Sequence, residues 1–238
     1  MSWAGSKAVD LYLGTRAVVL CRGAELMSKS AVVGLEAALR TADAQLQQNG
    51  RRSRLRVWLS GGLCRPFLMP DIPGVGSSLD LQKVAATMAP ARTGLDGDCK
   101  VWLDGQKSSA GTLAVALQGT VLAQILAGLA PRGRVVSIRP WWAEVLRARL
   151  ALPAKPGAVG VRDCDSLTVL AGRNDGFDVA SVVTPLFDQA SSESAWTRAL
   201  FSADLQSQAA WQARLVIEDR NLQPFAGCAL GPLVEVAA

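Results

Sequence analysis

Two short turns carry the residues of this chain that could do chemistry. Gly14 and Thr15 follow an apolar run, and the backbone N–H groups of such a turn can cradle a phosphate. Asp163, Asp165 and Ser166 occupy a second turn much later in the chain and would face the first turn across a cleft. The plainer interpretation, which we favour, is that Gly14 forms a tight hairpin turn and the aspartates cap the second turn. These turns therefore predict at most a vestigial phosphate site.

The residue types that are missing exclude several kinds of active site. The chain contains no histidine, which excludes Ser-His-Asp and Cys-His triads, histidine-ligated metals and imidazole acid–base catalysis. Its five cysteines are widely spread and form no Cys-x-x-Cys pair: Cys21, Cys64, Cys99, Cys164 and Cys228. We expect neither a disulfide framework nor a metal site, but buried thiols in a reducing cytoplasm.

Length and hydropathy indicate a globular protein with a core. The chain has 238 residues, half of them hydrophobic, enough for one large domain or two intimate halves. No apolar block of signal-peptide length follows the first charges. The longest apolar stretch, Thr112–Ala130, is interrupted by Gln and Gly and is interpreted as a strand followed by a helix, not a membrane span. We place the protein in the cytoplasm, recruited to the inner membrane by a partner.

The hairpin that contains the first turn occurs twice. Residues 10–22 form an apolar run, a Gly-Thr turn and a second apolar run; residues 159–172 repeat this scheme, and a third run follows at 177–183. Each copy opens an α/β unit. The pair suggests an α/β, duplicated actin-like (RNase-H-like) fold with two subdomains.

We expect the first subdomain at residues 1–152 and a second, shortened one at 157–238. The linker-like segment Leu152–Gly157 separates them. A strand–helix–strand unit at residues 56–117 is expected to be inserted in the first subdomain.

Capping and breaking residues predict several boundaries in the first half. Ser28 or Ser30 is expected to cap the first helix, and Pro90 to end a helix that begins at Ser78. A polar turn at Asp104–Gly105 is expected to join two strands.

Further boundaries follow toward the C-terminus. Pro140 is expected to be the first residue of a helix, where its missing N–H costs nothing. Helices are predicted at 194–205 and 205–213, before a last strand at Arg214–Glu218.

Adjacent tryptophans begin the helix after Pro140. Because neighbouring helical residues diverge by about 100°, one of Trp141 and Trp142 is expected in the core and the other at the rim. An exposed indole there could anchor a partner. Four other large side chains are expected mostly in the core of the strands: Trp58, Phe67, Met69 and Trp102.

The densest basic cluster is Arg51–Arg56, with four arginines in six residues. A solvated loop is the plain interpretation, and docking to anionic lipid or an acidic partner is the alternative. DNA is not favoured, because the one aromatic residue beside the cluster, Trp58, lies inside a predicted strand.

The order of elements resembles the PilM/GspL family, the actin-like cytoplasmic components of type IV pilus and type II secretion platforms. Four stretches carry the resemblance: Leu11–Leu20; Arg56–Pro70, an apolar strand, a small turn and a strand ending in Met-Pro; Thr112–Leu129 with Val135–Pro140; and Arg162–Leu170 with Gly176-Phe177.

The resemblance implies a degenerate nucleotide site. Relatives that bind ATP carry an acid before Gly-Ser/Thr, and Tyr12 stands in its place here. A phenol cannot replace a carboxylate as a ligand of a hard cation at neutral pH. Asp10, two residues earlier on the same strand face, stays open as a substitute acid.

The resemblance also implies a groove that takes a short cytoplasmic peptide of a membrane partner. Arg65 and Arg139 each flank an apolar strand end before a proline and could receive a carbonyl or carboxylate of that peptide. Together with Phe67, Trp141 and Trp142 they are the candidate partner-binding residues.

These observations favour a non-catalytic adaptor of a type IV pilus or type II secretion-like inner-membrane platform. It would bind the cytoplasmic tail of a bitopic membrane protein and link it to a motor ATPase. Self-association is a further possible contact, and no cofactor is expected. One alternative is an ATP-binding actin-like or sugar-kinase-like enzyme with Asp10, Asp163 or Asp165 at a magnesium site. Another is a membrane-surface or nucleic-acid binder that uses Arg51–Arg56.

Overall fold

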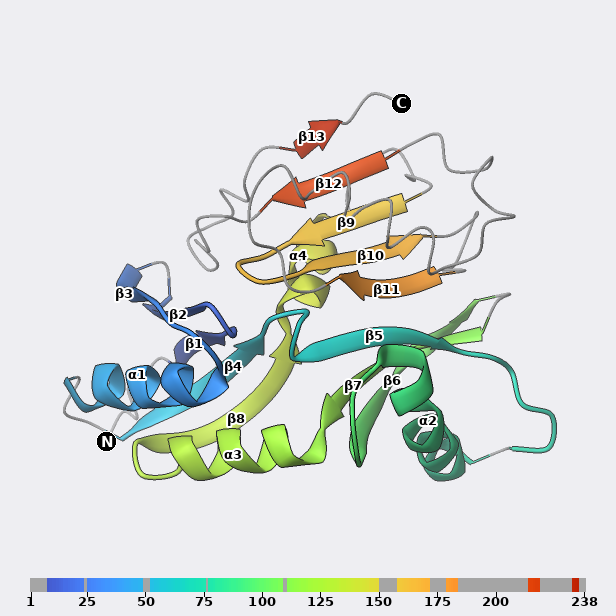
Figure 1. Ribbon diagram of the computed structural model, residues 1–238, viewed down its shortest axis with the longest axis horizontal. Coiled ribbons are helices and arrows are strands. Elements are labelled where there is room, and N and C mark those ends of the chain that lie inside the picture. The colour runs from blue at the N-terminus through green and yellow to red at the C-terminus, as the bar shows by residue number, and fades with distance from the viewer. Residues whose placement is uncertain are drawn as a thin grey trace, which may run out of the picture.

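The computed structural model describes residues 8–23, 25–48, 52–75, 77–108, 111–149, 158–171, 179–183, 214–218 and 233–235. Their strands form two five-stranded sheets and one three-stranded sheet. In Figure 1 the second five-stranded sheet lies above the other two. Within these residues no helix combines the length and the apolar character needed to cross a membrane.

The first five-stranded sheet has the strand order β3-β2-β1-β4-β8. Its members are β1 (Val9–Leu13), β2 (Ala17–Arg22), β3 (Glu25–Ala31), β4 (Ser53–Leu59) and β8 (Gly133–Pro140). β1 pairs antiparallel with β2 and parallel with β4. Every residue of β1 is buried, as expected for a central strand that is covered on both faces.

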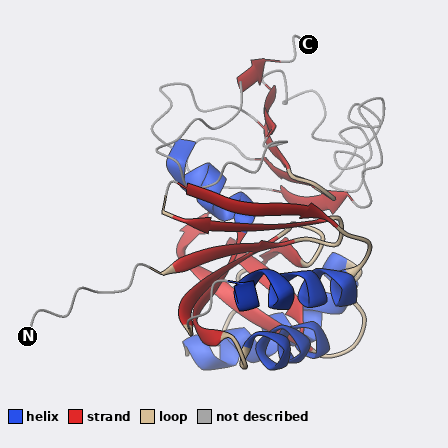
Figure 2. Cartoon of the chain, turned by 90° about the vertical axis from the view of Figure 1, so that its left-hand side faces the viewer, coloured by secondary structure: helices blue, strands red, loops and turns tan. Residues whose placement is uncertain are grey.

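Helices cover both faces of this sheet. α1 (Leu35–Gln48) and α3 (Gly119–Leu129) pack on the face that carries Leu11 and Leu13, whereas α4 (Trp141–Arg149) packs on the face that carries Tyr12. Figure 2 shows the strands as a layer with α4 above and the other two helices below. The core on the α4 side also contains Val161 and Leu170 of the second sheet, so it joins the two halves.

The second five-stranded sheet repeats the topology of the first. Its strand order is β11-β10-β9-β12-β13, made of β9 (Ala158–Arg162), β10 (Leu167–Ala171), β11 (Val179–Val183), β12 (Arg214–Glu218) and β13 (Leu233–Glu235). As in the first sheet, the opening strand pairs antiparallel with the next and parallel with the fourth. The copies differ at one edge, because β13 is antiparallel to β12 whereas β8 is parallel to β4. The predicted duplication is confirmed.

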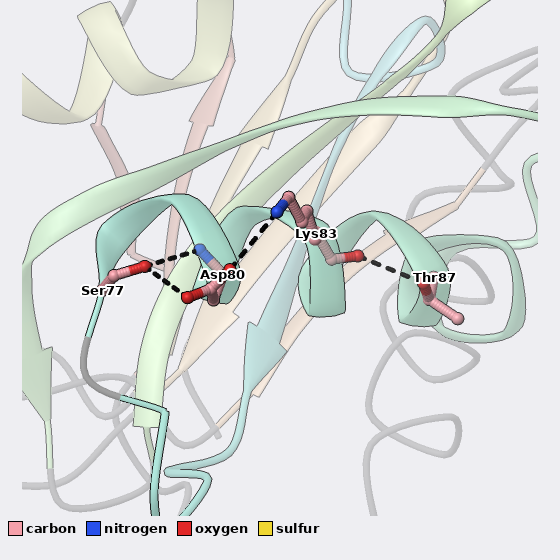
Figure 3. A network of polar contacts seen from close by, with 4 residues as sticks. All are labelled: Ser77, Asp80, Lys83 and Thr87. Atoms are coloured by element: carbon pink, nitrogen blue, oxygen red, sulfur yellow. Dashed lines mark hydrogen bonds and ion pairs between the residues drawn. The ribbon is translucent and has the colours of Figure 1, made fainter.

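A three-stranded sheet, in the order β5-β7-β6, is inserted in the first half. β5 (Cys64–Met69), β6 (Cys99–Ser108) and β7 (Gly111–Gln118) are antiparallel, and α2 (Ser78–Thr93) packs on one face. Figure 3 shows how α2 begins: Ser77 Oγ accepts a hydrogen bond from the Asp80 backbone N–H at 3.1 Å, and Lys83 lies beside the Asp80 carboxylate. Such a cap supplies one of the acceptors that the first turn of a helix lacks.

Three boundary predictions for the first half are wrong. Ser28 and Ser30 belong to β3 and pair with β2, and α1 begins only after Gly34, whose φ of +82° suits glycine. Pro90 lies inside α2, which continues to Thr93 and is capped by Gly94 with its left-handed φ. Asp104–Gly105 falls within β6, where the pairing with β7 shifts register, and the chain turns only beyond Ser108.

Other predictions are nearly exact or untested. Pro140 is the last residue of β8 and the helix begins at Trp141, one residue later than expected. The predicted strand Arg214–Glu218 is confirmed as β12. The segment Leu152–Gly157, the helices predicted at 194–205 and 205–213, and Cys228 lie outside the described residues.

Candidate functional site

The Gly14–Thr15 turn forms the tip of the β1–β2 hairpin. The Gly14 backbone N–H donates to the Ala17 carbonyl at 3.0 Å, which closes the hairpin. The Thr15 carbonyl accepts from the Gly34 N–H at 2.7 Å, so the connection to α1 holds the turn from behind. The backbone N–H and the hydroxyl of Thr15 are left to point away from the hairpin.

A second turn, Ser60–Gly61, lies beside the first at the end of β4. β1 and β4 are parallel with Leu13 opposite Leu59, so their following residues meet at one edge of the sheet. The Ser60 N–H donates to the Leu13 carbonyl at 3.0 Å. Sequence reasoning missed this turn as a site, although Ser60 and the glycine pair directly follow an apolar strand.

The turn between β9 and β10 is built around the Asp163 carboxylate. Asp163 Oδ1 accepts hydrogen bonds from the backbone N–H groups of Asp165 at 3.1 Å and Ser166 at 2.8 Å, and from Ser166 Oγ at 2.8 Å. The Asp163 N–H closes the turn on the Ser166 carbonyl at 3.0 Å. This aspartate therefore shapes its own turn, as the plainer interpretation of the sequence expected.

Both aspartates also reach across to the first half. Asp165 Oδ2 accepts from Thr15 N at 2.6 Å, from Thr15 Oγ1 at 2.7 Å and from Ser60 Oγ at 3.1 Å. Asp163 Oδ2 accepts from Gly61 N at 2.9 Å. The structure thus brings all five predicted turn residues together with Ser60 and Gly61, in direct contact. We call this set of contacts the carboxylate plug.

The backbone approach at the carboxylate plug leaves no room for added atoms. A Cβ built on Gly61 would lie 2.3 Å from Thr168 Oγ1 and 2.7 Å from Ser166 Oγ. A Cβ on Gly14 would lie 3.1 Å from Asp165 Oδ2 and from the Tyr12 ring. Glycine is needed at Gly61 because the two halves meet there at van der Waals distance.

Burial dominates the electrostatics of the plug. Asp163 is 4% and Asp165 2% exposed. Burial, with Asp165 adding to it, raises the pKa of Asp163 well above its usual value, although the hydrogen bonds from Gly61, Asp165 and Ser166 oppose the rise. Burial likewise raises the pKa of Tyr12 well above its usual value, with Asp163 and Asp165 as secondary causes. The phenol is therefore neutral and offers no anionic ligand.

Asp10, the alternative acid, is engaged elsewhere. Its Oδ2 lies 2.5 Å from Arg56 Nη2, and its Oδ1 accepts from Trp58 Nε1 at 3.0 Å. Both partners come from β4, which pairs in parallel with the strand of Asp10. Asp10 therefore ties two strands of the sheet together, away from the contacts that define the carboxylate plug.

The structure buries three of the five candidate partner-binding residues. Phe67, Trp141 and Trp142 are at most 2% exposed, so the expectation that one of the paired indoles lies at the rim is wrong. Both fit inside because α4 is sandwiched between the two halves: Trp141 packs edge-on to Tyr12, and Trp142 Nε1 donates to the Cys64 carbonyl at 3.1 Å. These side chains cannot line a groove in this conformation.

Of the two arginines in that set, Arg65 is partly buried and Arg139 is exposed. Arg65 Nη1 donates to the Thr93 carbonyl at 2.7 Å and Nε to the Gly62 carbonyl at 3.3 Å. Burial lowers its pKa, with Asp165 and Asp96 opposing. Arg65 therefore holds the end of α2 against β5, and Arg139 is the member of the set whose side chain can contact a partner directly.

The remaining core expectations divide. Trp58 and Met69 are buried as expected, but Trp102 on the edge strand β6 is 42% exposed and that expectation is wrong. Cys21, Cys64 and Cys99 are buried thiols, and burial raises the pKa of Cys64 to about 12 and of Cys21 to about 11. None of the four cysteines in the described ranges is in a disulfide.

A nucleotide and its magnesium do not fit these residues as they stand. The donors of Thr15, Ser60 and Gly61 that a phosphate would need already bind carboxylates, and bringing a phosphate to them would set anion against anion. Asp165 Oδ1 is buried and has no hydrogen-bond partner among the described residues. Even so, no group of three or more Asp, Glu or Cys side chains converges to hold a metal anywhere in the part of the chain that the structure describes.

Comparison with known proteins places the fold. By sequence the chain matches no protein-family model and no curated protein. By structure it is similar to the cytoplasmic domain of EpsL, an inner membrane component of the type II secretion system of Vibrio cholerae, with a TM-score of 0.55 and 13% identity over 89% of this chain and 82% of that one.

Two further solved structures are similar. A Bacteroides thetaiotaomicron protein with an actin-like ATPase fold and unknown function matches with a TM-score of 0.54 and 8% identity, over 84% of this chain and 79% of that one. A chain of the PilM–PilN type IV pilus biogenesis complex matches with a TM-score of 0.50 and 19% identity, over 75% of this chain and 61% of that one. The predicted actin-like fold is confirmed.

Proposed function

We propose that this protein is a nucleotide-independent adaptor of an inner-membrane assembly platform of the type IV pilus or type II secretion kind. It would bind the cytoplasmic segment of a membrane partner and connect it to a motor ATPase, without hydrolysing nucleotide itself. The fold shared with the EpsL cytoplasmic domain and with the PilM–PilN complex supports the choice of platform.

The carboxylate plug carries the proposal that no nucleotide is used. In the actin-like fold the two opening turns face each other, and here they hold each other through the carboxylates of Asp163 and Asp165. A buried hydrogen bond to a charged group contributes about 1.5–3 kcal/mol. Phosphate binding would have to break several such contacts and separate the halves, and this free-energy cost would be subtracted from the affinity for nucleotide.

Titration calorimetry with Mg-ATP tests this part of the proposal. We expect no binding heat from the wild-type protein at millimolar nucleotide. The comparison variant is Thr15→Val, which removes one hydroxyl donor of the turn and should also give no heat of Mg-ATP binding. Micromolar binding by the wild-type protein that is lost in Asp163→Ala would replace the adaptor with the ATP-binding alternative.

Co-purification tests the adaptor role. The protein would be co-expressed with the short cytoplasmic head of a bitopic inner-membrane protein from the same organism's pilus or secretion platform, and the pair passed over a sizing column. A stoichiometric complex that forms in the absence of nucleotide, and is lost when the head is deleted, is the expected result. Arg139→Ala, at the exposed candidate position, should weaken this complex more than Arg92→Ala on the far helix α2. Failure to form a complex with or without nucleotide would contradict the adaptor role.

A further inference from the structure

Two neighbouring strands of the first sheet carry four exposed arginines on one face. Arg54 and Arg56 lie on β4, and Arg134 and Arg139 lie on β8. Arg54 is directly opposite Arg134, and Arg139 is opposite Trp58, which shares a face with Arg54 and Arg56. We call these four residues the arginine face. Only half of it is visible in the sequence cluster 51–56; the register of β8 supplies the rest.

The arginine face has almost no compensating negative charge. Of the residues in β1, β2, β4 and β8, Asp10 is the one carboxylate, and it pairs with Arg56. No side-chain hydrogen bond or ion pair joins Arg54, Arg134 or Arg139 to another of the described residues. Arg52, also exposed, immediately precedes β4 and adds a further cation.

The spacing of these charges makes them act together. Paired residues on adjacent strands lie about 5 Å apart, and alternate residues on one strand about 7 Å apart. Both distances are below the Debye length of about 10 Å at 0.1 M salt, so their potentials add. Both strands begin at the end of the first sheet that points away from the second sheet (Figure 1), and Arg54 and Arg134, near these beginnings, are exposed.

The shape of the arginine face fits a flat anionic surface better than a nucleic acid. A protein that reads the grooves of duplex DNA inserts a helix or a β-ribbon into them, and a protein that binds single-stranded nucleic acid stacks the bases on exposed aromatic rings. Here the cations lie on a sheet, and the nearby Trp58 is only 6% exposed. A lipid bilayer demands neither feature, since dispersed headgroup charges attract any cluster of basic residues close to the surface.

We infer that the arginine face binds directly to the surface of a membrane rich in anionic phospholipids. This contact goes beyond recruitment by a membrane partner and does not depend on the proposed adaptor function. It would place the first residues of β4 and β8 at the bilayer surface, because α4 and the second half cover the other end of the same face, around Trp58. Arg139, at the other end of the face, would then lie where a lipid-bound protein could also meet a partner.

Sedimentation with vesicles tests this inference on the full chain. We expect binding to phosphatidylglycerol-rich vesicles at low salt, no binding to pure phosphatidylcholine, and loss of binding at about 0.5 M salt. A cation near an anionic surface contributes about a fivefold factor. The variant Arg54→Gln/Arg134→Gln should therefore bind roughly 25-fold more weakly. Both side chains are exposed and have no ion pair in the described structure, so the fold should be retained.

The matched control is Lys83→Gln/Arg92→Gln on α2, which removes the same charge from exposed positions far along the chain from the face. Its lipid binding should change less than threefold. Equal losses in both double variants would mean that net charge alone acts, and would overturn the inference. So would absence of binding to phosphatidylglycerol vesicles, or tighter binding to a DNA duplex that is lost in Arg54→Gln/Arg134→Gln. ATP titration and partner co-purification remain separate readouts for the proposed function.

Discussion

The two five-stranded sheets share one strand order but present opposite chemistry at their opening turns. The first half offers donors, the N–H groups of Thr15 and Gly61 and the hydroxyls of Thr15 and Ser60, whereas the second half offers the carboxylate oxygens of Asp163 and Asp165. A duplication by itself would set like turns face to face. The turn residues of the two copies differ, and the donors of one half bind the carboxylates of the other.

This difference changes what holds the lobes together. Where two lobes present donors to a common ligand, the ligand joins them; here one lobe supplies the anions itself. The apolar contact beneath the plug, in which Tyr12 and Trp141 of the first half share a core with Val161 and Leu170 of the second, adds to the same closure. The two halves are therefore expected to stay closed whether or not ATP or ADP is present. The following variants challenge that expectation.

Removing the Asp165 carboxylate should have the largest effect. Asp165→Ala leaves three donors of the first half without their acceptor, and each unsatisfied buried group costs about 1–3 kcal/mol. We expect unfolding by urea to show a loss of about 3 kcal/mol. Formate, a carboxylate small enough to enter the vacated space, should stabilise Asp165→Ala more than the wild-type protein. A variant as stable as wild type would mean that the plug holds nothing together.

Adding one carbon at Gly61 should have the next largest effect. The Cβ of Gly61→Ala would collide with Thr168 Oγ1 and Ser166 Oγ, and overpacking of this kind costs about 1–3 kcal/mol. In the part of the chain that the structure describes, Thr168 Oγ1 has no hydrogen-bond partner, so Thr168→Ala alone should cost little stability and should partly restore the stability of Gly61→Ala. Thermal unfolding of the two single variants and the double variant measures this coupling. Additive losses would show that the halves do not meet as closely at Gly61 as the structure has them.

Removing one hydroxyl donor, of Thr15 or of Ser60, should lower the free energy of unfolding less than removing the Asp165 carboxylate that accepts from both. Thr15→Val and Ser60→Ala each delete one hydroxyl donor to Asp165 Oδ2 while the backbone N–H of Thr15 still binds it. A single hydrogen bond of this kind contributes about 1.5 kcal/mol, the lower end of the range for bonds to charged groups. Urea unfolding should therefore rank both variants between wild type and Asp165→Ala. Either variant losing as much as Asp165→Ala would contradict the view that one carboxylate serves three donors.

The smallest effect we expect is a change in the pH dependence of stability. The pKa of Asp163 is raised on folding, so the folded chain binds more protons than the unfolded chain between the ordinary Asp pKa of 3.8 and the raised value. The contribution of Asp163 to stability is therefore complete below that ordinary value and is lost as pH rises through the raised one. Stability measured from about pH 7 down to about pH 5 should fall more in Asp163→Asn than in the wild-type protein.

Asp43 provides the opposite case for this measurement. Arg132 lies 2.6 Å from its carboxylate, and that hydrogen bond lowers the pKa of Asp43. Its contribution is present above the ordinary Asp pKa and is lost as pH falls below it, so Asp43→Asn should leave the slope between about pH 7 and pH 5 unchanged. A change in the Asp43→Asn slope equal to that of Asp163→Asn would mean that the buried carboxylate has no special pH dependence.

Local signals predicted much of the fold. The hairpin at residues 10–22 and its later copy follow from apolar runs separated by turn residues, and strand β12 was predicted to the residue at Arg214–Glu218. The signals failed where packing competed with them: α2 continues past Pro90, and Ala85 and Ala89 on the turns before the proline are buried against the three-stranded sheet. Trp141 and Trp142 are both buried because two lobes, not one, enclose their helix.

The candidate site divides along the same line. Sequence alone determined that Gly14, Thr15, Asp163, Asp165 and Ser166 lie in turns. It also determined that the phenol of Tyr12 cannot replace a carboxylate as a ligand of a hard cation, since turn propensity and side-chain chemistry depend on the residues themselves and their neighbours in sequence. Tertiary structure alone decided that the turns bind each other, that Ser60 and Gly61 belong with them, and that Arg134 joins Arg54. The contact between Thr15 and Asp165 spans 150 positions, and no local pattern specifies how two lobes close or how two strands align in register.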